Sequence, residues 1–168
     1  EYPTSADILL SMLSHSGLRL DKLEKLSEIS GILKVHKPWK NEVNILINYS
    51  NHPSEYWSKE QKDAAAKNYG TVIDVPFPSV PSAAGSEEVN NLTEFYFREL
   101  QVLIKALNAE SSTVVHLMGE FTFSFALLCK LKNSGVKVIA STSERVTSIN
   151  SDGSKQSYFK FIRFREYA

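Results

Sequence analysis

Two short polar segments of the chain carry side chains suited to binding a ligand. The first follows the apolar run 43–50 and brings hydroxyl, amide and imidazole groups into one loop, at Ser50, Asn51, His52 and Ser54. These groups donate and accept hydrogen bonds without adding much charge, which suits recognition of phosphates and bases. The same residues also suit a turn that caps the next helix, so both interpretations stay open for Asn51 and His52.

The second polar segment follows the apolar run 113–118 and contains Gly119, Glu120, Thr122 and Ser124. An apolar run that passes through a glycine into a helical pattern predicts a strand, a tight turn and a helix. The start of such a helix has unpaired N–H groups and about half a positive charge, which favours a phosphate. Glu120 would oppose an anion if it pointed inward. It could instead serve the helix dipole or bind a ribose hydroxyl.

A third polar stretch is predicted to form a loop after the last parallel strand, 136–140. Ser141, Thr142 and Arg145 would supply two hydroxyls and a guanidinium there, which could close over a phosphate. In the alternative interpretation this loop binds nothing and Arg145 pairs with Glu144 or Glu120.

Three further residues of reactive types are predicted to be structural. Trp57 could stack on a purine but is expected to cover the core, and His116 is expected to be a hydrogen-bonded core histidine. Cys129 lies within an apolar helical pattern and is expected to be a buried packing residue. The four histidines and the single cysteine lack metal-ligand spacing, so no metal, cofactor or catalytic residue is predicted.

The bulk composition is that of one α/β domain. The chain has 168 residues, of which 42% are hydrophobic, enough for one well-buried core. Nineteen basic and nineteen acidic residues cancel, so no overall field is available to hold duplex nucleic acid. A small anionic ligand needs only a local pocket and stays compatible with this composition.

Alternating elements predict a mainly parallel sheet with helices on both faces, followed by a C-terminal β-hairpin. Residues 1–42 are expected to be a helical connector, with a helical pair over 4–33, and residues 43–168 the main domain. Within that domain we expect strands at 43–50, 71–75, 113–118 and 136–140, helices at 58–67, 87–108 and 121–133, and a hairpin over 145–167.

The order of these strands predicts where a ligand would bind. If strand 43–50 is central, the chain first moves outward to 71–75 and then returns to place 113–118 on the other side. Ligands bind open α/β sheets at the carboxyl ends of the strands where the order reverses. The first two polar segments described above both lie at this point.

The hairpin is expected to turn at Asp152–Gly153. Large apolar residues of its second strand fall on both faces. Either both faces are covered, or a bulge lies near Phe161.

Four segments together resemble small CRISPR-associated proteins with a CARF-type domain: Asn48–Pro53, His116–Glu120, Ala140–Arg145 and Phe161–Tyr167. The resemblance covers about residues 43–168, and the helical pair lies outside it. It implies a Rossmann-like homodimer that binds cyclic oligoadenylate, the messenger of type III CRISPR systems. Cyclic tetra-adenylate is the commonest ligand of such proteins.

In this family the ring lies across the dimer two-fold and contacts the loops after the first and fourth core strands. The strand 113–118 takes the role of the fourth strand by position only, because this chain is one unit shorter than the family pattern. The resemblance therefore assigns ligand contacts to Ser50, Asn51 and His52, and to Gly119, Glu120 and Thr122.

Three functions are compatible with this resemblance. In the first, the chain is the cytoplasmic sensor domain of an antiviral CRISPR effector. Its start at Glu1 and the helical pair favour an upstream segment, which is expected to span the inner membrane. In the second, it is a stand-alone ring nuclease using His52 and Arg145, and in the third an interaction domain without a nucleotide ligand. The sensor is preferred, because no nuclease motif is present.

Overall fold

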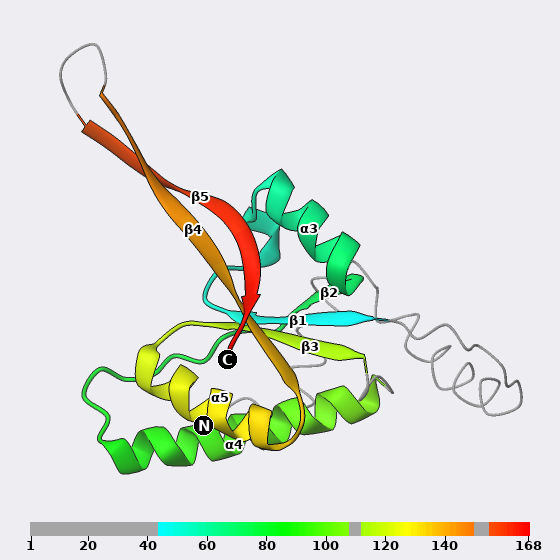
Figure 1. Ribbon diagram of the computed structural model, residues 1–168. Coiled ribbons are helices and arrows are strands. Elements are labelled where there is room, and N and C mark those ends of the chain that lie inside the picture. Colours follow the sequence, from blue (N-terminus) through cyan, green and yellow to red (C-terminus); the bar gives the residue numbers. More distant parts are fainter. Residues whose placement is uncertain (1–43, 108–111, 150–154) are drawn as a thin grey trace, which may run out of the picture.

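Five strands form one sheet in the order β2–β1–β3–β4–β5 (Figure 1). The computed structural model describes residues 44–107, 112–149 and 155–168. Within these ranges the strands are β1 (Ile45–Ser50), β2 (Thr71–Asp74), β3 (Thr113–Met118), β4 (Lys137–Ile149) and β5 (Lys155–Glu166). The first four strands of this order are parallel, and β5 is antiparallel to β4 along the whole of their pairing. The fold is therefore mixed α/β, and only part of the sheet is parallel.

Helices lie against both faces of this sheet in the described part of the chain. They are α3 (Lys59–Tyr69), α4 (Ser86–Ala106) and α5 (Phe121–Asn133), and a short 3-10 turn, η2 (Ser54–Tyr56), precedes α3. Figure 1 shows α3 on one side of the sheet and the packed pair α4 and α5 on the other. The predicted crossing of the sheet is confirmed, because β1 lies between β2 and β3.

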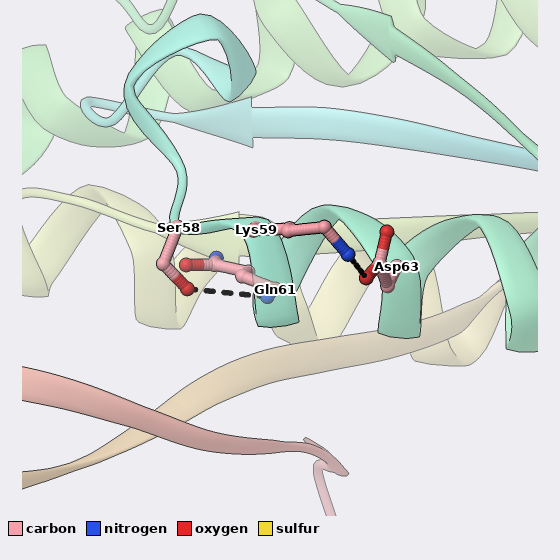
Figure 2. Close-up of polar contacts among 4 residues, drawn as sticks. All are labelled: Ser58, Lys59, Gln61 and Asp63. Atoms are coloured by element: carbon pink, nitrogen blue, oxygen red, sulfur yellow. Dashed lines mark hydrogen bonds and ion pairs between the residues drawn. The ribbon is translucent and has the colours of Figure 1, made fainter.

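The first turn of α3 is fixed by its cap (Figure 2). The Ser58 hydroxyl accepts a hydrogen bond from the Gln61 amide at 3.2 Å, and Lys59 pairs with Asp63 at 2.7 Å. The helix stops at Gly70, whose φ of 78° lies in the region that favours glycine. Ser58 and Gly70 therefore set the two ends of α3.

The residues of β1 alternate between two buried environments. Ile45, Ile47 and Tyr49 join the larger core beneath α4 and α5. Leu46 instead joins a smaller cluster with Ala65 of α3. All six residues of the strand are buried, as expected for a central parallel strand covered on both faces.

The prediction of a polar loop after residue 140 is wrong, because β4 continues without a break to Ile149. Hydrogen bonding to β5 along this stretch keeps the polar residues extended, and the two strands form a long arm (Figure 1). The register shifts where Thr142 pairs with Arg163 and Ser143 pairs with Phe161, which leaves Ile162 as the extra residue. The alternative of a bulge near Phe161 is thus confirmed.

The expectation that Cys129 is buried is also wrong, because its side chain is exposed. α5 buries Phe123, Leu127 and Leu131 against the sheet, and Cys129 falls on the opposite side of the helix. None of the helices in the described ranges is long and apolar enough to cross a membrane. The helical pair expected at 4–33 and the turn expected at 152–153 lie outside the described residues.

Candidate functional site

A row of polar side chains crosses four strands near the carboxyl edge of the sheet, on the face covered by α3. It runs from Asp74 on β2 through Asn48 on β1 and His116 on β3 to Ser141 on β4. Asn48 stands opposite both Asp74 and His116 in the strand register. The Asn48 amide nitrogen lies 2.6 Å from Asp74 Oδ1, and its oxygen lies 2.8 Å from His116 Nδ1. His116 Nε2 in turn lies 2.8 Å from Ser141 Oγ.

The donors and acceptors of this row follow from its geometry. Asn48 Nδ2 donates to the His52 carbonyl at 3.0 Å and to Asp74, so Asn48 Oδ1 must be the acceptor facing His116. His116 Nδ1 therefore carries a proton, and Nε2 accepts from Ser141. Burial lowers the pKa of His116 to about 4, which keeps the ring neutral at pH 7.

Aromatic rings and α3 enclose the same histidine. The rings of Trp57 and Phe164 meet the imidazole nearly edge-on, with centroids at 5.3 and 5.5 Å. Gln61 of α3 donates to the Ser141 hydroxyl at 3.0 Å. His116 is thus the hydrogen-bonded core histidine that was predicted, and Trp57 is the predicted cover, only 6% exposed.

The row holds the backbone of the loop after β1. The His52 carbonyl accepts from Asn48 Nδ2 and from Trp57 Nε1, each at 3.0 Å. Asp74 accepts from the Ser54 amide at 2.9 Å. The side chains of Asn51 and His52 are exposed above this fixed backbone. The loop is therefore pre-organised, with the Asn51 side-chain amide and the His52 imidazole exposed at its surface.

Ser50 and Ser54 help to hold the backbone of this loop, and neither side chain is fully exposed. Ser50 is 5% exposed, and its hydroxyl donates to Asn48 Oδ1 at 2.8 Å and accepts from the His52 amide at 3.2 Å. The Ser54 hydroxyl donates to Asp74. Of the four loop residues predicted to bind a ligand, Asn51 and His52 are the two with exposed side chains.

The turn after β3 lies directly beside this loop. The Asn51 backbone amide donates to the Met118 carbonyl at 3.1 Å, which joins the first residue of the loop to the last residue of β3. Gly119 is covered by Phe77, because a Cβ at this position would lie 2.2 Å from the phenyl ring. The glycine is therefore required for close packing of the loop that follows β2.

Glu120 caps the N-terminus of α5 with its own carboxylate. It accepts from the Thr122 amide at 3.1 Å and the Phe123 amide at 2.8 Å, and from the Thr122 hydroxyl at 2.8 Å. These hydrogen bonds, led by that from Phe123, lower the pKa of Glu120. Glu120 was expected either to serve the helix dipole or to bind a ribose hydroxyl, and in the structure its carboxylate serves the helix. Two N–H groups expected to meet a phosphate are occupied by this carboxylate.

The remaining predicted residues are spread along α5 and the arm. The Ser124 hydroxyl is buried without a hydrogen-bond partner among the described residues. Thr142 donates to the Arg163 carbonyl at 3.1 Å. Arg145 is exposed on the arm, opposite Phe159 and four residues beyond Ser141, which is about 13 Å along an extended strand. The two loops and Ser141 thus meet at one edge, whereas Arg145 lies outside this group.

Sequence reasoning missed three members of the site: Asn48, Asp74 and Gln61. Asn48 interrupts an apolar run just as His116 does, and this shared break in two neighbouring strands was the available signal. The described ranges contain no group of three histidine, cysteine, aspartate or glutamate side chains that could hold a metal ion.

The chain matches the model of a known family. The family described as uncharacterized protein MJ1673 matches residues 44–165, which is most of the chain and every strand except the last residue of β5. No curated protein and no solved structure matches the chain significantly. The chain belongs to the MJ1673 family.

Proposed function

We propose that this member of the MJ1673 family is a Rossmann-like, CARF-type sensor domain that binds cyclic oligoadenylate, with cyclic tetra-adenylate as the expected ring. The observation that carries this proposal is the hydrogen bond between Asn51 and Met118. It joins the loops after β1 and β3 at the point where the strand order reverses, which is where open α/β sheets bind ligands.

The exposed groups at this edge suit a small nucleotide ring better than they suit a long polyanion such as duplex nucleic acid. Asn51 offers two donors and an acceptor, and His52 offers an imidazole, both on a loop whose backbone is already fixed. A fixed loop loses little conformational entropy on binding. The nearest charged side chain of the turn, Glu120, is engaged with its own helix.

A ring of identical nucleotides presents the same groups more than once around its axis. A symmetric dimer presents the same patch twice, so two copies of this edge would form matched half-sites. We therefore propose a homodimer as the binding unit. We further propose that its output lies in a membrane-anchored segment outside this chain, as part of an antiviral CRISPR effector.

Cleavage of the ring is the second candidate function, and one observation favours it. The exposed imidazole of His52 could move a proton at a ribose hydroxyl. However, Arg145, the cation expected to stabilise the developing charge, lies on the arm away from this loop. A binding site without efficient cleavage is therefore the preferred proposal.

A calorimetric titration with cyclic tetra-adenylate tests the assignment of the loop. Asn51→Ala should weaken binding at least 10-fold, because it removes the exposed side-chain amide and keeps the backbone N–H that donates to Met118. Asn68→Ala, at an exposed position of α3, is the matched control and should bind like the wild type. Equal affinities for both variants and the wild type would place the site elsewhere.

A further inference from the structure

The arm formed by β4 and β5 carries an excess of positive charge. Residues 142–165 hold five basic and two acidic side chains, whereas the rest of the chain holds fourteen basic and seventeen acidic ones. Among the described residues, the ion pairs do not involve Arg145, Lys155 or Lys160. Figure 1 shows that the arm extends outward beyond the helices. Its cations are therefore available to an anionic partner, although the chain as a whole is neutral.

One face of the arm combines these cations with an exposed aromatic ring. Phe159 is 74% exposed and lies directly opposite Arg145 in the strand register. Side chains two residues apart in a strand share a face. The described side chains on this surface, outward from Arg145 and here called the Phe159 face, are therefore Arg145, Thr147, Lys155, Ser157 and Phe159. None of them is acidic, and Glu144 lies on the opposite face together with Lys160.

This combination suits a single-stranded nucleic acid. Proteins bind single strands by stacking bases on aromatic rings and by holding the phosphates with nearby cations. Phe159 offers the ring, and Arg145 offers a guanidinium directly beside it. Lys155 lies four residues away on the same strand, about 13 Å towards the end of the arm, and would meet a phosphate further along the strand. A duplex keeps its base faces stacked on one another, so it offers no base to the exposed ring.

The hydroxyls of the Phe159 face favour RNA over DNA. Thr147 and Ser157 lie opposite each other, next to the pair of Arg145 and Phe159, and both side chains are exposed. Their hydroxyl oxygens are 3.0 Å apart, and either hydroxyl is able to donate. Together they offer a donor and an acceptor to a ribose 2′-hydroxyl, the group by which proteins distinguish RNA from DNA.

An anionic membrane would also attract the cations of the arm, but the sequence argues against this partner. Insertion into a membrane surface needs apolar side chains that reach the acyl chains. The five residues that connect β4 to β5 are Asn150, Ser151, Asp152, Gly153 and Ser154, all without an apolar side chain and one of them acidic. The charge and the aromatic ring lie along the strands instead, where an extended chain of nucleotides would run.

We propose that the Phe159 face binds single-stranded RNA, with a base stacked on Phe159 and phosphates held by Arg145 and Lys155. This site is separate from the loops after β1 and β3, and the proposal does not rest on the proposed function. Few phosphates are contacted, so binding is expected in the micromolar range and with a shallow dependence on salt.

Fluorescence anisotropy of a labelled oligouridylate of about 12 nucleotides, titrated with the full 168-residue chain, tests this site. Phe159→Ala should weaken binding at least about 5-fold, because a stacked base is lost, and should leave the salt dependence unchanged. Arg145→Gln should weaken binding and reduce the slope of log K against log salt concentration by about 0.7, the loss of one phosphate contact.

Two variants outside the arm are the matched controls. Phe125→Ala removes a phenyl ring that is 68% exposed on α5, and Lys67→Gln removes an exposed cation of α3. Both should bind the oligouridylate like the wild type. Absence of binding to the wild type, or equal losses in the control variants and the arm variants, would overturn the proposal.

The alternative partners are tested in the same experiment. Equal affinity for the matching oligodeoxythymidylate would contradict the assignment to RNA. Binding to phosphatidylserine vesicles without binding to the oligouridylate would assign the arm to a membrane. Sedimentation of Phe159→Ala tests a protein partner, because a change in oligomeric state without any binding of RNA would assign the face to a second copy and overturn the proposal.

The outcome is distinguishable from that for the proposed function. Asn51→Ala should bind the oligouridylate like the wild type, and an excess of unlabelled cyclic tetra-adenylate should not displace the RNA. Loss of RNA binding in Asn51→Ala, or displacement by the ring, would place both ligands in the loop after β1 and contradict a separate site on the arm.

Discussion

The imidazole Nε2 of His116 accepts a hydrogen bond from the Ser141 hydroxyl, with 2.8 Å between the two atoms. This contact ties the centre of the parallel sheet to the residue at which β4 begins to extend into the arm. On its other side the same ring is held by Asn48, which also fixes the loop after β1. A single buried histidine therefore links the candidate ligand loop to the base of the arm.

The stability of the fold should fall when His116 becomes protonated. The pKa of His116 is lowered from 6.5 to about 4, chiefly by burial, so the unfolded chain binds a proton more readily. The stabilising contribution is complete above pH 6.5 and is lost as the pH falls towards 4, for a total of about 3 kcal/mol. The free energy of unfolding, measured in urea at several pH values, should fall between pH 6.5 and 4. His116→Gln should reduce this dependence on pH, and an unchanged dependence in the variant would contradict the buried environment assigned to His116.

Replacing Tyr49 by phenylalanine should stabilise the protein by about 1 kcal/mol. The Tyr49 hydroxyl is buried and has no hydrogen-bond partner among the described residues, and burial raises the pKa of this group. Tyr167→Phe is the matched control with the opposite sign, because the Tyr167 hydroxyl donates to the Leu117 carbonyl at 3.0 Å. Chemical denaturation of both variants checks the difference. A loss of stability in Tyr49→Phe would reveal a partner for the hydroxyl.

A methyl group at Gly119 should disturb the packing of Phe77. The clash is with a ring that also contacts Tyr49 and Phe123, so Gly119→Ala is expected to cost about 1–3 kcal/mol. Gly85→Ala should cost less, about 0.5–1 kcal/mol, because its nearest neighbour lies at 3.8 Å and the only loss is that alanine caps α4 less well than glycine. A double-mutant cycle with Phe77→Leu measures the coupling, and a coupling energy near zero would rule out this explanation.

Removing the Glu120 carboxylate should weaken α5 without abolishing ligand binding. Glu120→Ala loses the cap of the helix, which is worth about 1 kcal/mol, and frees the amides of Thr122 and Phe123. Thermal unfolding and a parallel ligand titration measure the two effects separately. If binding were lost while stability stayed constant, the carboxylate would be a ligand contact instead of a cap.

Local patterns in the sequence were sufficient for the elements around the site. The apolar run before Gly119 and the helical spacing after Glu120 predicted β3 and α5 with the bounds observed. The contact between Asn48 and Asp74 could not be predicted in the same way, because it depends on the register between strands 26 residues apart. Ser141 was predicted to lie in a loop because the residues after it are polar. It lies in a strand instead, because pairing with β5 keeps this stretch extended.

The exposure of Cys129 was missed for a different reason. Its neighbours in α5 are mostly apolar, and composition alone does not indicate which side of such a helix faces the sheet. The side is set by Phe123, Leu127 and Leu131, which pack into the core. Helical spacing of these three residues was visible in the sequence, but two of the phenylalanines around them turned out to face solvent.

The central claim is tested most directly by incubating the purified chain with labelled cyclic tri-, tetra- and hexa-adenylate and following both binding and product. The account predicts tight binding of one ring, with cyclic tetra-adenylate expected, little conversion to linear product, and a loss of at least 10-fold in affinity for Asn51→Ala. Because the site uses mainly neutral donors, affinity should fall only modestly with salt. Absence of binding to all three rings, or binding unaffected by Asn51→Ala, would contradict it.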